Sequence, residues 1–255
     1  MLKSYVDTAI RGHDLPPFIH RSQTALSPSL PLTTCLAVIR ICSGPRHGSA
    51  DIISELLNRE MARLLEQQPS YDDMGLLSAF QAYLIYSMVI FFRLGQGARP
   101  ALQQAMMNLQ SLACSSCRGG LMCSEEQRGD RPRWEHWVAA EAKRRTLLTM
   151  YLFDSLLLTE DSLPTYLGKE LTGLPAPACR TLWEAQTRHD WTARYNVHLT
   201  EWISGYLRIE ELWSLADDEE DGIVADRRQR VDLWLEGLDG FGTVIYAVTC
   251  STHGT

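Results

Sequence analysis

The spacing of apolar residues is helical along most of the chain. No segment alternates apolar and polar residues for long enough to indicate a β-sheet. The longest unbroken helical pattern runs from Trp134 to Pro164. From Leu147 onward its apolar side chains point in all directions, which a soluble helix tolerates only where other helices cover it. We therefore predict an all-α fold with this segment as a central buried helix.

Further helices are expected on both sides of the central one. They are predicted at residues 2–11, from a cap at Thr33 or Thr34 to Gly44, from a cap at Ser49 to Leu65, at residues 73–92, 101–113 and 190–202, and finally from about Asp226 to Val248. Proline-rich residues 15–20 should lie extended as an anchor, and residues 167–180 should form a surface loop. No repeat or long linker divides the chain, so we predict one large helical domain over residues 1–255, with proline-rich surface loops.

The last two predicted helices carry distinctive residues. Gly237, Gly240 and Gly242 interrupt the final one, which indicates either a close helix crossing or a bend. The helix before it has an aromatic stripe on one side. The stripe consists of Trp191, Tyr195, His198, Leu199 and Trp202.

The most apolar segment, residues 76–92, raises the question of a membrane span. It is short for a span, contains Gln81, and is bracketed by Asp72 and Arg93. A buried helix is therefore favoured over a span, and we expect no membrane partner.

The first half of the predicted central helix is amphipathic. Trp134, Trp137 and Glu141 repeat at helical spacing, and Glu141 can reach Arg144 and Arg145 on the same surface. We predict structural roles for these five residues.

Asp154 stands alone inside the apolar half of the same helix. An unpaired carboxylate is costly to bury, and its neighbours four residues away, Met150 and Leu158, cannot bond to it. We therefore predict a structural role for Asp154, buried with a cationic or donor partner from elsewhere in the chain.

The composition excludes the disordered and fibrous classes of protein. A chain with 45% hydrophobic and 22% charged residues is typical of globular proteins, and a net charge of −7 gives no overall attraction to nucleic acid or anionic membranes. Seven cysteines without a secretory signal indicate a reducing compartment and free thiols.

Motifs for catalysis and cofactor binding are missing from the sequence: it has no HExxH, G-x-S-x-G, P-loop or dinucleotide-binding motif. We therefore predict no catalytic residues, no cofactor and no enzyme activity. Cys114, Cys117 and Cys123 could supply part of a zinc site, but a structural site usually needs four ligands, so free cysteines are favoured and no metal is expected.

Two basic runs could contact phosphate or an import receptor. The first, residues 143–145, lies mid-helix beside Glu141 and is better explained structurally. The second contains Arg227, Arg228 and Arg230 and is a possible nuclear localisation signal; a solvated helix face is the alternative.

Five segments together resemble the regulatory (middle homology) domain of fungal binuclear-zinc-cluster transcription factors, over about Leu2 to Gly254. They are LPPFIH at 15–20, LLSAFQAYLIYS at 76–87, RPRWEHWVAAEAKRRTLLTMYLFDSLL at 131–157, LPAPACRTLWEA at 174–185 and RVDLWLEGLDGFG at 230–242. The most specific part is W-x-x-W with E-x-K-R-R and an aliphatic run ending in Phe-Asp, followed by the loop that closes on Leu-Trp-Glu-Ala.

The resemblance implies an all-helical domain of a nuclear protein that controls transcription, often of metabolic or secondary-metabolite genes. The family's cysteine-rich zinc cluster does not occur in this sequence, so we expect no direct specific DNA binding by this chain. It is expected to act through protein partners, either the transcription machinery or a DNA-binding factor, or as part of a longer factor. A homo- or heterodimer is compatible with either mode of action.

One alternative from a different class stays open. The chain could be a helical small-molecule-binding protein or an enzyme unrelated to transcription. A deep apolar pocket with convergent polar groups would favour that alternative.

Overall fold

The computed structural model describes residues 1–25, 29–42, 50–95, 99–163, 168–214 and 221–253. Within these ranges the regular structure is helical, and the only β-type pairing is an isolated bridge between Pro175 and Arg208. The predicted all-α fold is confirmed. The predicted boundaries at Gly44, Ser49, Pro164 and Leu167 lie outside the described residues.

The predicted domain contains two compact units. Unit 1 comprises residues 1–120 and 145–157, and unit 2 comprises residues 121–144 and 158–255. The predicted central helix is α8, Trp134–Glu160, and it contributes residues to both units.

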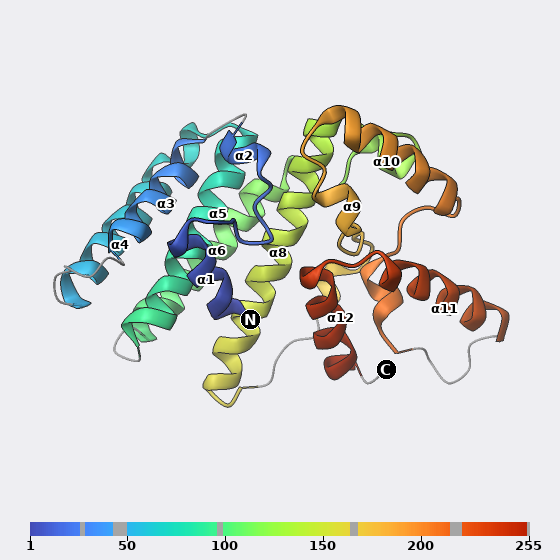
Figure 1. Ribbon diagram of the computed structural model, residues 1–255. Coiled ribbons are helices and arrows are strands. Elements are labelled where there is room, and N and C mark those ends of the chain that lie inside the picture. The colour runs from blue at the N-terminus through green and yellow to red at the C-terminus, as the bar shows by residue number, and fades with distance from the viewer. Residues whose placement is uncertain (26–28, 43–49, 96–98, 164–167, 215–220, 254–255) are drawn as a thin grey trace. The chain divides into compact units, whose positions relative to one another are not determined.

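Unit 1 is built around helix α5, Asp73–Val89, which packs against α1, α3, α4 and α6 (Figure 1). Its helical elements are α1 Leu2–Arg11, α2 Ser22–Ala25, α3 Leu30–Cys42, α4 Ala50–Gln67, η1 Gln68–Ser70, α5, η2 Ile90–Leu94 and α6 Arg99–Cys117. Helix α5 begins where the Asp72 carboxylate accepts the backbone N–H of Gly75 at 2.7 Å, which satisfies one of the free donors of the first turn. Almost every later residue of α5 is buried, so it is the core helix of this unit.

The stretch Asp73–Leu94 is, among the described helices, the one long and apolar enough to cross a membrane. However, 83% of its most apolar window is buried inside the fold. The Gln81 amide at its centre donates to the Phe18 carbonyl at 2.9 Å and accepts from the Gln23 amide at 3.1 Å. Phe18 lies in the proline-rich segment 15–20, which is therefore anchored in the core of unit 1 as predicted. The segment is not extended as expected, because it turns where the N–H of Ile19 donates to the Pro16 carbonyl at 2.9 Å.

Unit 2 contains three helices of 14 to 16 residues and several short helical turns (Figure 1). Besides the start of α8 these are α7 Ser124–Gln127, η4 Lys169–Leu171, α9 Arg180–Trp183, α10 Arg188–Glu201, η5 Ile209–Leu212, α11 Asp221–Glu236 and α12 Gly240–His253. The prediction of one long final helix is wrong, because α11 and α12 are separate. A Cβ atom on Gly237 would lie 2.9 Å from the Cβ of Cys179, and the Asp239 carboxylate caps α12 by accepting the N–H of Gly242 at 2.8 Å. The glycines thus permit both a close approach and a break.

The prediction of a surface loop at residues 167–180 is wrong for its centre. Pro175, Ala176 and Pro177 are buried. Their backbone is paired with residues distant in sequence: the N–H of Ala176 donates to the Leu207 carbonyl at 2.8 Å, and the Pro177 carbonyl accepts the indole N–H of Trp234 at 2.9 Å. A loop whose polar groups are paired in this way can be buried.

Burial along α8 is the reverse of what its sequence suggests. Residues 141–150, which contain the charged Glu141, Lys143, Arg144 and Arg145, are all buried. The apolar residues from Tyr151 to Leu158 are mostly half-buried. The pattern of apolar residues does not reveal that charged side chains are buried in the middle of this helix, where Glu141 and Arg144 form an ion pair.

Asp154 is half-buried, and no hydrogen bond or ion pair reaches its carboxylate from the described residues. The expected buried partner is therefore a wrong prediction for this part of the chain. Partial burial removes water from the carboxylate and raises its pKa.

Asp154→Asn is expected to leave the free energy of unfolding within about 0.5 kcal/mol of wild type at pH 7, or slightly above it. Because the pKa is raised in the folded state, the ionised carboxylate costs stability above its unfolded pKa, and asparagine removes that cost. Thermal melts of both proteins measure the difference, and a sharp drop in the melting temperature of the variant would show that Asp154 has a buried partner.

Candidate functional site

Glu141 and Arg144 are deeply buried charged groups of unit 2, and Glu126 lies beside them. Their side chains are 0%, 2% and 9% exposed. The Arg144 guanidinium donates from Nε to Glu141 Oε2 at 2.9 Å and from Nη1 to the Leu121 carbonyl at 2.7 Å, while Nη2 lies 3.5 Å from Glu126 Oε1. Two carboxylates therefore surround one guanidinium.

The local sequence explains how the cluster forms. Glu141 and Arg144 are three residues apart on α8, so their side chains share one face. Glu126 is fixed by the short helix α7, where its Oε2 accepts the N–H of Cys123 at 2.9 Å. The second oxygen of Glu141, Oε1, accepts the N–H of Ala178 at 2.9 Å. Glu141 thus holds the proline-rich loop against α8.

The predicted structural residues are distributed over both units. Trp134, Trp137, Glu141 and Arg144 lie in unit 2, and the predicted contact between Glu141 and Arg144 is present. Arg145 belongs to unit 1, where its Nη1 donates to the Pro17 carbonyl at 3.3 Å.

Aromatic rings continue from Trp137 along α10. The ring centroid of Trp137 lies 5.4 Å from that of Trp191, and Trp191 lies 4.6 Å from Tyr195. The His198 ring is 5.4 Å from Tyr195 and 5.9 Å from Trp202. The aromatic stripe predicted for this helix is therefore one continuous stack of side chains.

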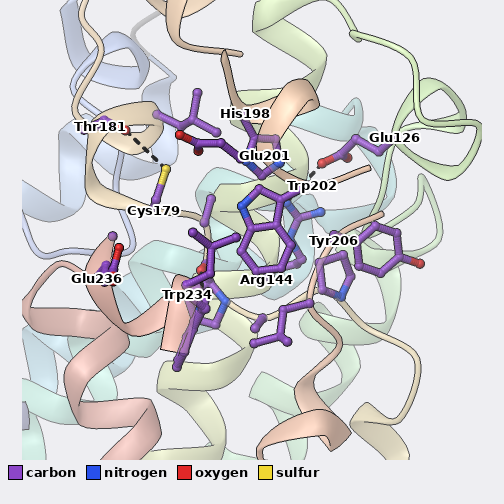
Figure 2. Close-up of a pocket in the computed structure, with 18 of the residues that line it drawn as sticks. Glu126, Arg144, Cys179, Thr181, His198, Glu201, Trp202, Tyr206, Trp234 and Glu236 are labelled. Atoms are coloured by element: carbon purple, nitrogen blue, oxygen red, sulfur yellow. Dashed lines mark hydrogen bonds and ion pairs between the residues drawn. The ribbon is translucent and has the colours of Figure 1, made fainter. Parts of the chain in front are cut away.

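A pocket of about 280 Å³ opens beside this stack, and all of its lining residues belong to unit 2 (Figure 2). Aromatic rings, carboxylates and the proline-rich loop form most of its wall. The lining side chains labelled in Figure 2 are Glu126, Arg144, Cys179, Thr181, His198, Glu201, Trp202, Tyr206, Trp234 and Glu236. The pocket is concave and combines aromatic rings with several polar and charged groups, features that small-molecule sites share.

Burial also sets the protonation of two groups at the site. It lowers the pKa of His198 to about 4, so this imidazole is neutral near pH 7. Burial, with Glu126 as the second cause, raises the pKa of the Cys123 thiol to about 12, so the thiol stays protonated.

The three cysteines considered for zinc are divided between the units: Cys114 and Cys117 lie at the end of α6 in unit 1, and Cys123 precedes α7 in unit 2. Within the described ranges no group of three or more His, Cys, Asp or Glu side chains is placed to hold a metal ion.

Two arginines of the basic run at Arg227 to Arg230 are bonded within unit 2, and the role of the run in nuclear localisation stays a prediction. Arg227 donates from Nε and Nη2 to the carbonyls of Glu211 and Glu210 at 2.8 and 2.9 Å. Arg230 donates to the Glu211 carboxylate at 2.8 Å and to the Tyr206 carbonyl at 2.9 Å. Only Arg228 of the three arginines is exposed. Two of them instead fasten α11 to the segment around η5.

Arg230→Ala is expected to lower the free energy of unfolding by about 1.5 kcal/mol, because it removes the hydrogen bonds that the guanidinium donates to the Tyr206 carbonyl and to the Glu211 carboxylate. The matched variant Arg228→Ala should change it by less than about 0.5 kcal/mol. Urea denaturation curves measure both. Equal effects of the two variants would contradict the contacts described for Arg230.

No known family model, curated protein or solved structure gives a significant match to this chain. The resemblance to fungal regulatory domains therefore depends on the five segments alone. Any function must be inferred from the site that these segments form.

Sequence reasoning missed the pocket although it found parts of its wall. The aromatic stripe supplied His198 and Trp202, and α8 supplied Arg144. Tyr206, Trp234 and the loop at Pro175–Cys179 meet these residues only through pairings distant in sequence. The tryptophan content of the C-terminal third was the one available signal for such a pocket.

Proposed function

We propose that this chain is a regulatory domain of the fungal transcription-factor type, which acts in the nucleus on metabolic or secondary-metabolite genes. It has no zinc cluster of its own, so it acts through protein partners or as part of a longer factor. The pocket of unit 2 is the site at which a small molecule would regulate it.

The observation that carries this proposal is the meeting of three of the five resembling segments. Glu141 in the segment 131–157 accepts the N–H of Ala178 in the segment 174–185 at 2.9 Å. The segment 230–242 joins the same loop twice, because Trp234 donates to the Pro177 carbonyl and the Gly237 carbonyl accepts the N–H of Arg180 at 2.8 Å. Together they form much of the pocket wall. The motif residues are thus parts of one built site, which supports a shared architecture over a chance likeness.

A tethered reporter tests the proposal. The chain is fused to an unrelated DNA-binding domain in a filamentous fungus, with that domain's binding sites upstream of a reporter gene. We expect reporter transcription to change relative to the DNA-binding domain alone, and the buried-cluster variant Arg144→Met to lose this effect. A fusion protein that is stable and located in the nucleus but leaves reporter transcription unchanged would contradict a regulatory role.

The pocket also favours a second candidate function, a small-molecule-binding protein without a role in transcription. Its aromatic wall and the polar groups around it are the features expected of such a protein. Binding without any effect in the tethered reporter would favour this second candidate.

A further inference from the structure

The charges around the pocket are unevenly compensated. Arg144 is neutralised by Glu141 and Glu126, and the neighbouring Arg230 by Glu211. By contrast, no hydrogen bond or ion pair reaches the exposed carboxylates of Glu201 and Glu236 from the described part of the chain. With His198 neutral, the walls of the pocket carry excess negative charge.

The rings in the wall add to this preference for positive charge. The electron-rich faces of tryptophan and tyrosine attract cations within about 6 Å of the ring centroid. The lining contains Trp202, Tyr206 and Trp234, and the ring of Trp202 already attracts one cation of the protein itself, because the Arg230 guanidinium carbon lies 5.5 Å from its centroid. Aromatic faces together with uncompensated carboxylates are the combination that recognises organic cations.

We propose that the pocket of unit 2 binds a small organic cation, an amine attached to a flat aromatic body. At about 280 Å³ the pocket has room for one such molecule of about the size of an indole ethylamine. The aromatic body packs among Trp202, Tyr206 and Trp234, and the ammonium group faces the carboxylates of Glu201 and Glu236. The inference deepens the proposed function by naming the class of effector and rests on it for the ligand's regulatory role.

Three probes with one ring system and different charges test this inference. They are tryptamine, a cation at pH 7, tryptophol, which is neutral, and indole-3-acetate, an anion. Isothermal titration calorimetry on the full chain is expected to show tryptamine binding at least about tenfold more tightly than indole-3-acetate, with tryptophol between them. The preference should shrink in high salt, because exposed carboxylates are screened.

A matched pair of variants locates the source of the preference. The double variant Glu201→Gln with Glu236→Gln is expected to bind tryptamine about fivefold more weakly and tryptophol as wild type does. Glu184→Gln, an exposed carboxylate of unit 2 outside the pocket, should leave both affinities unchanged. These glutamates are exposed, so the variants should fold, which equal melting temperatures would verify.

The inference is overturned if indole-3-acetate binds as tightly as tryptamine, if none of the three probes binds, or if the double variant retains the full preference. Because the titration uses the purified chain, its outcome does not depend on any effect on transcription. An active tethered reporter with no amine binding would overturn the ligand class alone, and amine binding with an inert reporter would overturn the regulatory role alone.

Discussion

Arg144→Met is expected to lower the free energy of unfolding by about 3 to 5 kcal/mol, because it removes the buried guanidinium that the carboxylates of Glu141 and Glu126 both contact. The same change orphans the Leu121 carbonyl, which accepts from Nη1. Such a loss is a large share of the stability of a typical domain. Denaturant unfolding followed by tryptophan fluorescence measures it, since Trp137 and Trp191 lie buried in the same unit.

The control is Arg133→Met, the same substitution at an exposed arginine just before α8. It should change stability by less than about 0.5 kcal/mol. Adding Glu141→Gln to Arg144→Met should recover part of the loss, because it removes one buried carboxylate charge while an amide oxygen can still accept the N–H of Ala178. If Arg144→Met unfolds like Arg133→Met, the charge cluster does not hold unit 2 together.

His198 is expected to make the protein less stable in mild acid. Its pKa is lowered to about 4 in the folded chain by burial, whereas a free imidazole titrates near pH 6.5, so between these values the unfolded state binds the proton more tightly. The contribution of the neutral His198 ring to the free energy of unfolding is complete above about pH 6.5. It is lost as the pH is lowered toward 4. Between pH 7.5 and pH 5 the loss should be about 2 kcal/mol.

The variant His198→Phe isolates this contribution, because it keeps an aromatic ring between Tyr195 and Trp202 and cannot be protonated. Denaturation curves of both proteins across this pH range give the difference in stability as a function of pH. The difference should move in favour of the variant by about 2 kcal/mol as the pH falls to 5. If the difference in stability between the two proteins does not change with pH, the imidazole is not buried in the folded state.

Interactions within one helix were predictable from the sequence, and those between segments were not. The pairing of Glu141 with Arg144 follows from a spacing of three residues. The contacts of the same Glu141 with Ala178, and of Arg144 with Glu126, depend on how loops return to α8, which no local pattern encodes.

The errors have physical causes of the same kind. Gly237 was compatible with both a bend and a close crossing, and the structure has both features, because Cys179 packs against Gly237 and α11 ends before it. Asp154 shows that an apolar run predicts burial only where other helices cover it. The contacts of Arg227 and Arg230 were missed because the carbonyls and the carboxylate that bind them are distant in sequence.

The proposed regulatory role is tested most directly by whether the chain must be in the nucleus in order to act. In a strain of the source organism lacking the gene, the chain is restored with an added nuclear export signal or with an inactive version of that signal, and transcripts are profiled. A nuclear regulator predicts that deletion changes a defined set of metabolic transcripts and that only the version with the inactive signal restores them. Equal restoration by both versions, or no transcript change on deletion, would contradict the proposed function.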